Sequence, residues 1–200
     1  LLHQQRLRSR PRRCERRLAQ TGQVEFCARS VLSDTELDEV MAIHSARQAE
    51  LAEQGKERQP VFAAQRERDA MLRLMELDAH SGRSRHYLLK VDGRTVAFSL
   101  GFACADVLVW HTTAFAPAQR KFGPGRIVAM RMLIAEIERG RTRCVDAAKG
   151  TTQIKLDLAN RTTRHLQFRL INPASIVSRW RCKSWAIVSQ AAARLRAARQ

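Results

Sequence analysis

The sequence predicts an α/β fold with an α+β mixed sheet, in which a three-strand antiparallel meander is followed by a strand, helix and strand unit. Two observations carry this prediction. Three runs are rich in β-branched and aromatic residues, and Asp92-Gly93 between the first two is typical of a tight hairpin. After the third run, 126–139 has helical periodicity and 142–148 again has strand character, so the last two strands should be parallel. The three runs are 85–91, 94–104 and 107–115.

A short strand and two helices are expected before the meander. The strand covers 23–30. Ser33 and Glu36 have the spacing of a capping box, which predicts a helix from there to about Glu53. A second helix is expected over 61–80. The buried stripes expected on these helices are Leu37, Val40, Met41, His44 and Leu51 on the first, and Phe62, Met71, Leu74, Met75 and Leu77 on the second.

Beyond the parallel unit we expect three more elements and two boundaries. The elements are a helix at 152–159, a strand at about 165–171 and a helix at 178–198. The expected domains are a basic helix or linker at 1–21, a central domain at 22–172 and a basic C-terminal helix at 173–200. The first segment could belong to an upstream domain, since the chain begins at Leu1 and could be a fragment.

The formal net charge of +17 is concentrated at the two ends. Residues 1–20 hold seven Arg against one Glu, and 158–200 hold eight Arg and one Lys without an acidic residue, which leaves +2 between them. Such ends can contact nucleic acid, anionic lipid or an acidic neighbouring domain. Biased codon composition explains the same Arg content, so nucleic-acid or membrane binding is not the favoured interpretation.

The remaining composition favours a soluble cytoplasmic protein without a metal. The five cysteines are odd in number and contain no Cys-x-x-Cys pair, which is typical of reduced thiols. The six His residues have no metal-ligand spacing. No signal-peptide pattern opens the chain, and the uncharged stretch 107–119 is too short to span a bilayer.

The loop between the third meander strand and the following helix is the strongest candidate for a binding site. Gly123 and Gly125 flank Pro124, so the backbone has freedom on both sides of a rigid residue. The helix begins here, and its unpaired N–H groups and positive dipole end point into the loop. The loop could therefore bind a phosphate or simply turn a corner. Its positive side chains are Arg120, Lys121 and Arg126.

The order of the elements and this loop resemble the GNAT acyltransferase superfamily. The acyl-CoA pyrophosphate signature of that family is Arg or Gln, two residues, Gly, one residue, then Gly or Ala. It reads here Arg120-Lys121-Phe122-Gly123-Pro124-Gly125. This match favours the phosphate-binding interpretation of the loop.

Within the superfamily, the chain looks like the CelD/BcsL-type branch, which is associated with bacterial cellulose or exopolysaccharide production. The stretches KVDGRTVAFSLGF, AFAPAQRKFGPGR and CVDAAKGTTQIK carry this resemblance. The chain departs from the branch at Ile154, where a Tyr is expected. Proteins of this branch often have two GNAT-like halves, and this chain resembles the C-terminal half. The matching residues are Pro124, Gly125, Arg126, Asp146, Gly150 and Lys155.

The resemblance implies that acetyl-CoA or another acyl-CoA is the cosubstrate. It would lie between the third meander strand and the returning strand, with its pantetheine arm along the backbone of 109–115. A side chain at Gly125 would then block the pyrophosphate, and residues 1–20, outside the matching segment, would be dispensable for CoA binding. The implied cofactor-binding residues are Trp110, Thr113, Phe115, Arg120, Lys121, Phe122, Gly123, Pro124, Gly125 and Arg126.

The implied reaction is direct transfer of the acyl group to an amine or hydroxyl of an unknown small-molecule or saccharide acceptor. Many GNAT enzymes protonate the leaving thiolate with a Tyr, but the only Tyr here, Tyr87, comes too early, so turnover should be slow. Each candidate for the general base or acid also has a purely structural interpretation as a packed or ion-paired side chain. The catalytic candidates are His111, Asp146, Lys155 and His44.

Two other functions remain open from the sequence. The chain could be a catalytically weak GNAT-like binding module. It could also be a Fem-type aminoacyl-tRNA-dependent transferase, although a tRNA donor would not need the pyrophosphate signature.

Overall fold

The computed structural model describes residues 11–55, 65–148, 150, 152–163, 172, 174–178 and 180. The chain divides into two compact units, Leu1–Asn160 and Arg161–Gln200. In the second unit, 176–178 and 180 are helical. The strand expected at 165–171 and most of the helix expected at 178–198 lie outside the described residues. No helix in the described ranges is long and apolar enough to cross a membrane.

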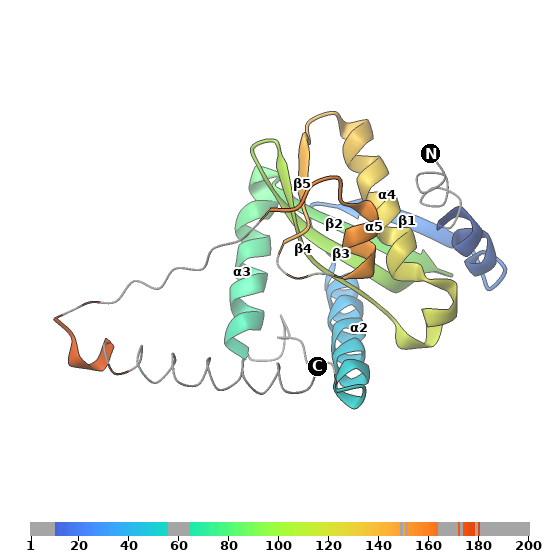
Figure 1. Ribbon diagram of the computed structural model, residues 1–200. Coiled ribbons are helices and arrows are strands. Elements are labelled where there is room, and N and C mark those ends of the chain that lie inside the picture. Colours follow the sequence, from blue (N-terminus) through green and yellow to red (C-terminus); the bar gives the residue numbers. More distant parts are fainter. Residues whose placement is uncertain are drawn as a thin grey trace. The chain divides into compact units, whose positions relative to one another are not determined.

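The first unit is built on one mixed sheet of five strands (Figure 1). Their spatial order β1-β2-β3-β4-β5 is also their order in the sequence. Neighbours are antiparallel except β4 and β5, which are parallel and joined through a helix. This confirms the predicted meander and the parallel unit after it. The strands are β1 (Val24–Arg29), β2 (Ser84–Val91), β3 (Arg94–Cys104), β4 (Val107–Phe115) and β5 (Cys144–Asp146).

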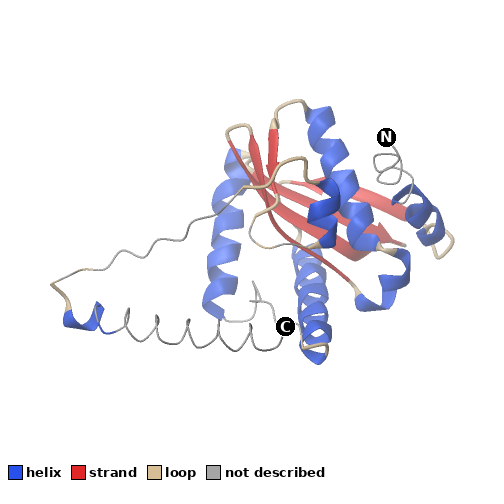
Figure 2. Ribbon diagram, viewed as in Figure 1, coloured by secondary structure: helices blue, strands red, loops and turns tan. Residues whose placement is uncertain are grey.

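Helices cover both faces of this sheet, as Figure 2 shows. The capping box at the start of α2 is present: the backbone N–H of Glu36 donates to Ser33 Oγ (3.2 Å), and the Ser33 N–H donates to Glu36 Oε2 (3.1 Å). The short 3₁₀ helix η1 joins β4 to α4. The helices are α2 (Asp34–Glu53), α3 (Gln65–Ser81), η1 (Pro117–Phe122), α4 (Pro124–Arg139) and α5 (Gln153–Leu158).

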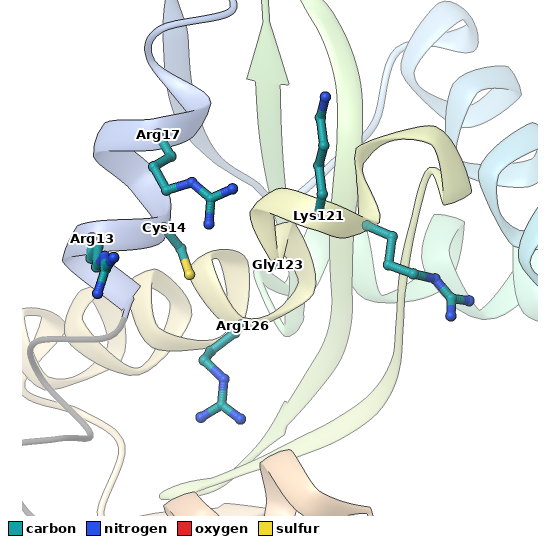
Figure 3. A pocket seen from close by; sticks show the side chains of 7 residues that line it. Arg13, Cys14, Arg17, Lys121, Gly123 and Arg126 are labelled. Atoms are coloured by element: carbon teal, nitrogen blue, oxygen red, sulfur yellow. The ribbon is translucent and has the colours of Figure 1, made fainter.

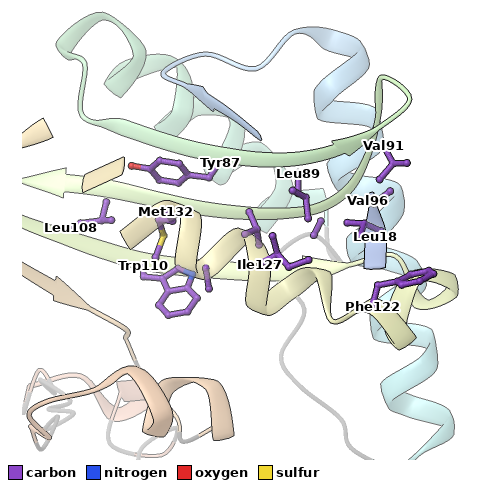
Figure 4. Packing of buried hydrophobic residues seen from close by; sticks show 13 residues of the cluster. Leu18, Tyr87, Leu89, Val91, Val96, Leu108, Trp110, Phe122, Ile127 and Met132 are labelled. Carbon is purple, nitrogen blue, oxygen red and sulfur yellow. The ribbon is translucent and has the colours of Figure 1, made fainter. Parts of the chain in front are cut away.

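Each face of the sheet has its own hydrophobic cluster. The cluster on the α4 face, drawn in Figure 4, combines Tyr87 of β2 and Trp110 of β4 with Met132 of α4. The cluster on the α2 face packs Val40 of α2 and Met71 of α3 against the opposite side of the strands. The two sides of the sheet are called the α4 face and the α2 face below, after the helix that packs on each.

The buried stripes of α2 and α3 differ from the expected ones. Leu74 and Leu77 of α3 are 40% and 64% exposed, because the contact with the sheet is made by Met71 and Met75 one turn apart. In α2, the buried residues include Ile43, which the predicted stripe had left out.

Within the segment expected to be a basic helix or linker, 1–21, the described residues from 11 onward pack on the α4 face. Residues 11–18 are helical, and this helical segment places Leu18, fully buried, in the same cluster as Ile127. Glu15 Oε1 accepts from Arg131 Nη2 of α4 at 2.6 Å. The described part of this segment therefore packs against the five-strand sheet, and the boundary expected at residue 21 stays a prediction.

Candidate functional site

The loop between β4 and α4 is shaped by one glycine in a left-handed conformation. Gly123 has φ 62° and ψ 44°, and it both ends η1 and precedes the first turn of α4. Its N–H donates to the Arg120 carbonyl (2.9 Å), and its own carbonyl accepts from the N–H of Arg126 (3.0 Å). The positive end of α4 therefore opens directly at the loop.

Gly125 has a packing role at the start of α4. It lies inside the first turn of α4 and is buried, and a Cβ added there would meet Phe115 Cδ1 at 3.0 Å. That separation is too tight for ordinary packing, so Gly125 permits the start of α4 to approach the end of β4. A side chain at this position would therefore disturb the packing of Phe115, and its predicted effect on a bound pyrophosphate stays a prediction.

A pocket of about 360 Å³ opens beside this loop (Figure 3). Its lining includes no acidic side chain, and one wall comes from the N-terminal helical segment. Figure 3 shows Cys14 and Arg17 pointing from that segment toward the loop that carries Gly123. The lining residues are Arg13, Cys14, Arg17, Arg120, Lys121, Gly123 and Arg126.

The cations around this pocket fall into two groups. Arg120 forms an ion pair with Glu50 of α2, and its guanidinium holds the pKa of that carboxyl below its usual range. Arg126 Nη2 lies 2.8 Å from Asp157 Oδ2 of α5. In the described part of the chain, Arg13, Arg17 and Lys121 form no ion pair. The pocket therefore has a positive potential and attracts anions.

Arg13, Cys14 and Arg17 are the site residues that the sequence prediction missed. We expected residues 1–20 to lie outside the binding domain, but three of them line its pocket. A local signal was present: Cys14 and Leu18 are four residues apart and mark one inward side of a helix in an otherwise basic stretch. The dispensability of residues 1–20 for CoA binding stays a prediction, and Arg13 and Arg17 are the residues whose replacement would test it.

The second half of β4 has one edge without a partner strand. β5 pairs with β4 only from Val107 to Val109, and Asp146 opposite Val109 ends the strand. In the described residues, no strand pairs with this edge of 110–115, so its backbone groups are available to an extended ligand. The predicted opening between the two strands is present.

A β-bulge at His111 changes which way the following residues face. Leu100 of β3 pairs with Thr112, and Gly101 pairs with Trp110, so His111 is the extra residue. Leu108 and Trp110 point to the α4 face, whereas Ala114 points to the α2 face. The bulge therefore separates the paired half of β4 from the half that leads to the loop.

Several residues predicted to bind the cofactor are part of the packing. Trp110 is 5% exposed, and its Nε1–H donates to Thr113 Oγ1 at 2.5 Å. Phe122 is 8% exposed and belongs to the cluster on the α4 face. Only backbone groups of these residues can meet a ligand. Phe115 is half-buried, with the Arg47 guanidinium 4.7 Å from its ring centroid.

His111 is the catalytic candidate with an accessible side chain on β4. Its ring lies edge-on to Phe102 with 6.0 Å between the centroids, and desolvation lowers its pKa. It is therefore largely neutral near pH 7, which is the form that can accept a proton. Its place at the bulge puts it at the boundary of the unpaired edge.

The other catalytic candidates differ in their surroundings. Asp146 lies at the end of β5, and its Oδ1 accepts the N–H of Ala148 at 2.8 Å. Lys155 lies in the last turn of α5 and is half-buried. His44 is 3% exposed within α2, and burial lowers its pKa. His44 is therefore placed as a packing residue, while Asp146 and Lys155 remain near the connection that follows β5.

Neither the tyrosine of this chain nor residue 154 provides an acid for the leaving thiolate. Tyr87 is fully buried, and its hydroxyl donates to Glu136 of α4. Burial and this carboxylate raise its pKa. Ile154 packs against the cluster on the α4 face. A tyrosine substituted at 154 would have to leave that cluster before its hydroxyl could reach a ligand.

The comparison with known proteins agrees with this geometry. The family model described as "Acetyltransferase (GNAT) domain" matches residues 5–156, which includes the N-terminal helical segment and the pocket loop. No curated protein matches the sequence. Proteins of the GNAT family use acetyl-CoA as the acyl donor.

Solved structures show the same fold at low sequence identity. A protein from Clostridium acetobutylicum described as a "predicted acetyltransferase with acetyl-CoA" is 11% identical, with a TM-score of 0.51 over 74% of this chain and 96% of that one. The aminoglycoside N-acetyltransferase AAC(6')-Iy with a bisubstrate analogue is 12% identical, with a TM-score of 0.51 over 74% and 99%.

The match with a third solved structure spans a smaller part of both chains. The ribosomal-protein-S18-alanine N-acetyltransferase of Escherichia coli is 16% identical with a TM-score of 0.38, and the match spans 60% of this chain and 63% of that one. The family model covers more than three quarters of the sequence and includes every strand of the sheet. The chain therefore belongs to the GNAT acetyltransferase family.

Proposed function

We propose that this chain binds acyl-CoA in the pocket beside α4 and transfers the acyl group to an amine or hydroxyl acceptor. One observation carries the proposal. A cationic pocket without acidic side chains lies at the start of α4, next to the second half of β4, whose outer edge has no partner strand in the described residues. The diphosphate of CoA would meet Lys121 and the positive end of α4. The pantetheine arm would run along the edge of β4 toward the bulge.

His111 is the residue that we propose as the general base. Its neutral imidazole would take the proton from the attacking amine or hydroxyl as the nucleophile adds to the thioester carbonyl. The thioester oxygen would accept from backbone N–H groups on the unpaired edge of β4. Collapse of the adduct releases the CoA thiolate, which water protonates because no phenol is available there. Asp146 and Lys155 are the second choices for proton transfer.

The acceptor that we propose is a saccharide in the cytoplasm. Support comes from the CelD/BcsL-type motif, whose residues form structural contacts around the site: Arg126 pairs with Asp157, and Asp146 caps the turn after β5. Four of the five cysteines lie in the described residues and are free thiols, which fits a reducing compartment. The link to cellulose or exopolysaccharide production rests on this motif alone.

Binding is tested by calorimetry with acetyl-CoA and free CoA on the full chain. Lys121→Gln should weaken both by about tenfold, because it removes one charge-assisted contact with the diphosphate. Arg143→Gln is the matched control, since Arg143 is 86% exposed and does not line the pocket. Wild-type protein that binds neither ligand would refute the proposed site.

Catalysis is tested by CoA-thiol release with panels of amine and saccharide acceptors. His111→Gln should lower kcat by about a hundredfold or more and leave CoA affinity unchanged, because a base acts on the acceptor. The wild-type rate should fall as pH drops through the pKa of His111, and the variant should lose that limb.

A second candidate function is supported by the positions of Tyr87 and Ile154. Since neither can protonate the thiolate, the chain could be an acyl-CoA-binding module without turnover. Tight CoA binding with no thiol release for any acceptor, and no effect of His111→Gln, would favour this module over the enzyme.

A further inference from the structure

Two arginines from outside the pocket loop add positive charge to the pocket, in addition to the loop cations proposed to bind the diphosphate. Arg13 and Arg17 lie on the N-terminal helical segment and line the pocket together with Lys121 and Arg126 of the loop side. Figure 3 shows this segment and the loop on two sides of the pocket. The sequence separation exceeds one hundred residues, so the juxtaposition is produced by the tertiary fold.

The charges on the loop side are already partly compensated. Arg120 and Arg126 are held by Glu50 and Asp157. In the described part of the chain, Arg13 and Arg17 have no acidic partner, and Arg17 lies 5.9 Å from the Phe122 ring centroid. The electrostatic attraction for an anionic ligand should therefore be strongest on the side of the pocket formed by the helical segment.

The helical segment is fixed in place before any ligand binds. Leu18 is fully buried among residues of the α4 face. Glu15 accepts two hydrogen bonds from Arg131 of α4, from Nε at 3.0 Å and from Nη2 at 2.6 Å. Because the backbone that carries Arg13 and Arg17 is anchored, little ordering entropy is lost when their side chains contact a ligand.

CoA has a second anionic group that matches this geometry. Besides its diphosphate, it bears a phosphomonoester on the ribose, which approaches two negative charges near pH 7. Arginine forks bind such a group through paired charge-assisted hydrogen bonds. We infer that Arg13 and Arg17 bind the 3′-phosphate of CoA and make this chain selective for CoA over dephospho-CoA. This inference rests on the proposed function, which places the diphosphate at the loop.

The same helix offers matched controls. Arg12 and Arg16 are exposed, have the same charge and do not line the pocket. Replacing any of the four arginines with Gln changes the net charge equally, so a general electrostatic effect would appear in all four variants. A bound 3′-phosphate predicts an effect in Arg13→Gln and Arg17→Gln alone.

The test measures the affinities of the full chain for CoA, dephospho-CoA and adenosine 3′,5′-bisphosphate by calorimetry. Wild type should prefer CoA over dephospho-CoA by about tenfold or more, and adenosine 3′,5′-bisphosphate should compete with CoA. Arg13→Gln and Arg17→Gln should each lose about tenfold for CoA and less than about twofold for dephospho-CoA. Arg12→Gln and Arg16→Gln should match wild type.

The remaining outcomes separate this inference from the proposed function. Lys121→Gln should weaken CoA and dephospho-CoA equally, because it acts on the diphosphate that both contain. If wild type binds both equally, or if Arg13→Gln and Arg17→Gln weaken both equally, the assignment to the 3′-phosphate is wrong while the loop site stands. If wild type binds none of the three, the proposed function itself fails. Thermal unfolding without ligand identifies a variant that has lost its fold.

Discussion

The two faces of the sheet differ in the hydrogen-bond partners of their buried polar groups. On the α4 face, Glu136 is 2% exposed and accepts from Tyr87, Arg139 and Thr142. On the other side of β2, His86 is fully buried, and neither ring nitrogen has a hydrogen-bond partner in the described residues. One face therefore holds a charge by surrounding it with donors, and the other holds an imidazole in its neutral form.

This difference indicates which face tolerates change. Removing a buried carboxylate that accepts from several donors is destabilising, because the donors then lose their partner. A neutral buried imidazole contributes little by itself, but it opposes protonation. Removing Glu136 should therefore destabilise the protein strongly, whereas mild acid should act through His86.

The largest effect is expected from removing the carboxylate on the α4 face. Glu136→Ala should lower the free energy of unfolding by about 3–5 kcal/mol, because the Tyr87 hydroxyl and the Arg139 guanidinium lose a buried partner. Glu138→Ala, at an exposed position on the same helix, should stay within about 0.5 kcal/mol of wild type. Urea unfolding of both variants measures this contrast, and equal values would contradict it.

Mild acid should act on the other face through His86. Burial, with a smaller effect of Arg85, lowers the pKa of His86 to about 4 in the folded protein. The unfolded chain takes up a proton near pH 6.5, so stability should fall by about 3 kcal/mol as pH drops from 6.5 toward 4, and should be flat above this range. His86→Leu should remove this contribution. Denaturant unfolding of both proteins across this pH range would show it, and parallel curves would refute it.

The close approach of α4 to β4 gives the next largest effect. Gly125→Val should cost about 2 kcal/mol, because the new side chain meets the ring of Phe115. In a Phe115→Ala background the same change should cost much less, since the obstructing ring is gone. A double-mutant cycle in thermal or urea unfolding measures this coupling. Additive effects would mean that Gly125 is needed for another reason.

The smallest effect on stability is expected from replacing the residues that precede the first turns of α2 and α5. Ser33→Ala should destabilise by about 1 kcal/mol, because it removes the side-chain acceptor of the capping box of α2. Thr152, at the start of α5, makes no side-chain cap bond, so Thr152→Ala should be close to neutral. Equal losses for the two variants would contradict the assigned cap.

The elements that the sequence predicted well are those set by local chemistry. The β-branched runs and the Asp92-Gly93 hairpin specify the meander without knowledge of the rest of the fold, and the capping box specifies the start of α2. The backbone freedom expected on both sides of Pro124 is used at Gly123, which is left-handed. In each case the signal lies within a few residues of the structure that it determines.

The features that the sequence could not provide depend on distant partners. The bulge at His111 is a property of the pairing between β3 and β4, so alternation in β4 alone gives the wrong facing for Thr113. Leu74 and Leu77 fit a helical stripe, but α3 contacts the sheet through Met71 and Met75, which are one turn apart. Arg13 and Arg17 line the pocket because Leu18 packs in a cluster with residues of α4, more than one hundred residues later in the sequence.

The short pairing between β4 and β5 also affects how the sheet opens. β5 contributes three residues to the sheet edge, whereas β2 and β3 pair along most of their length. Local opening should therefore start at β5, and its backbone amides should exchange with deuterium sooner than those in the centre of the sheet. A ligand lying along the neighbouring edge of β4 would then slow this exchange without changing that of β2.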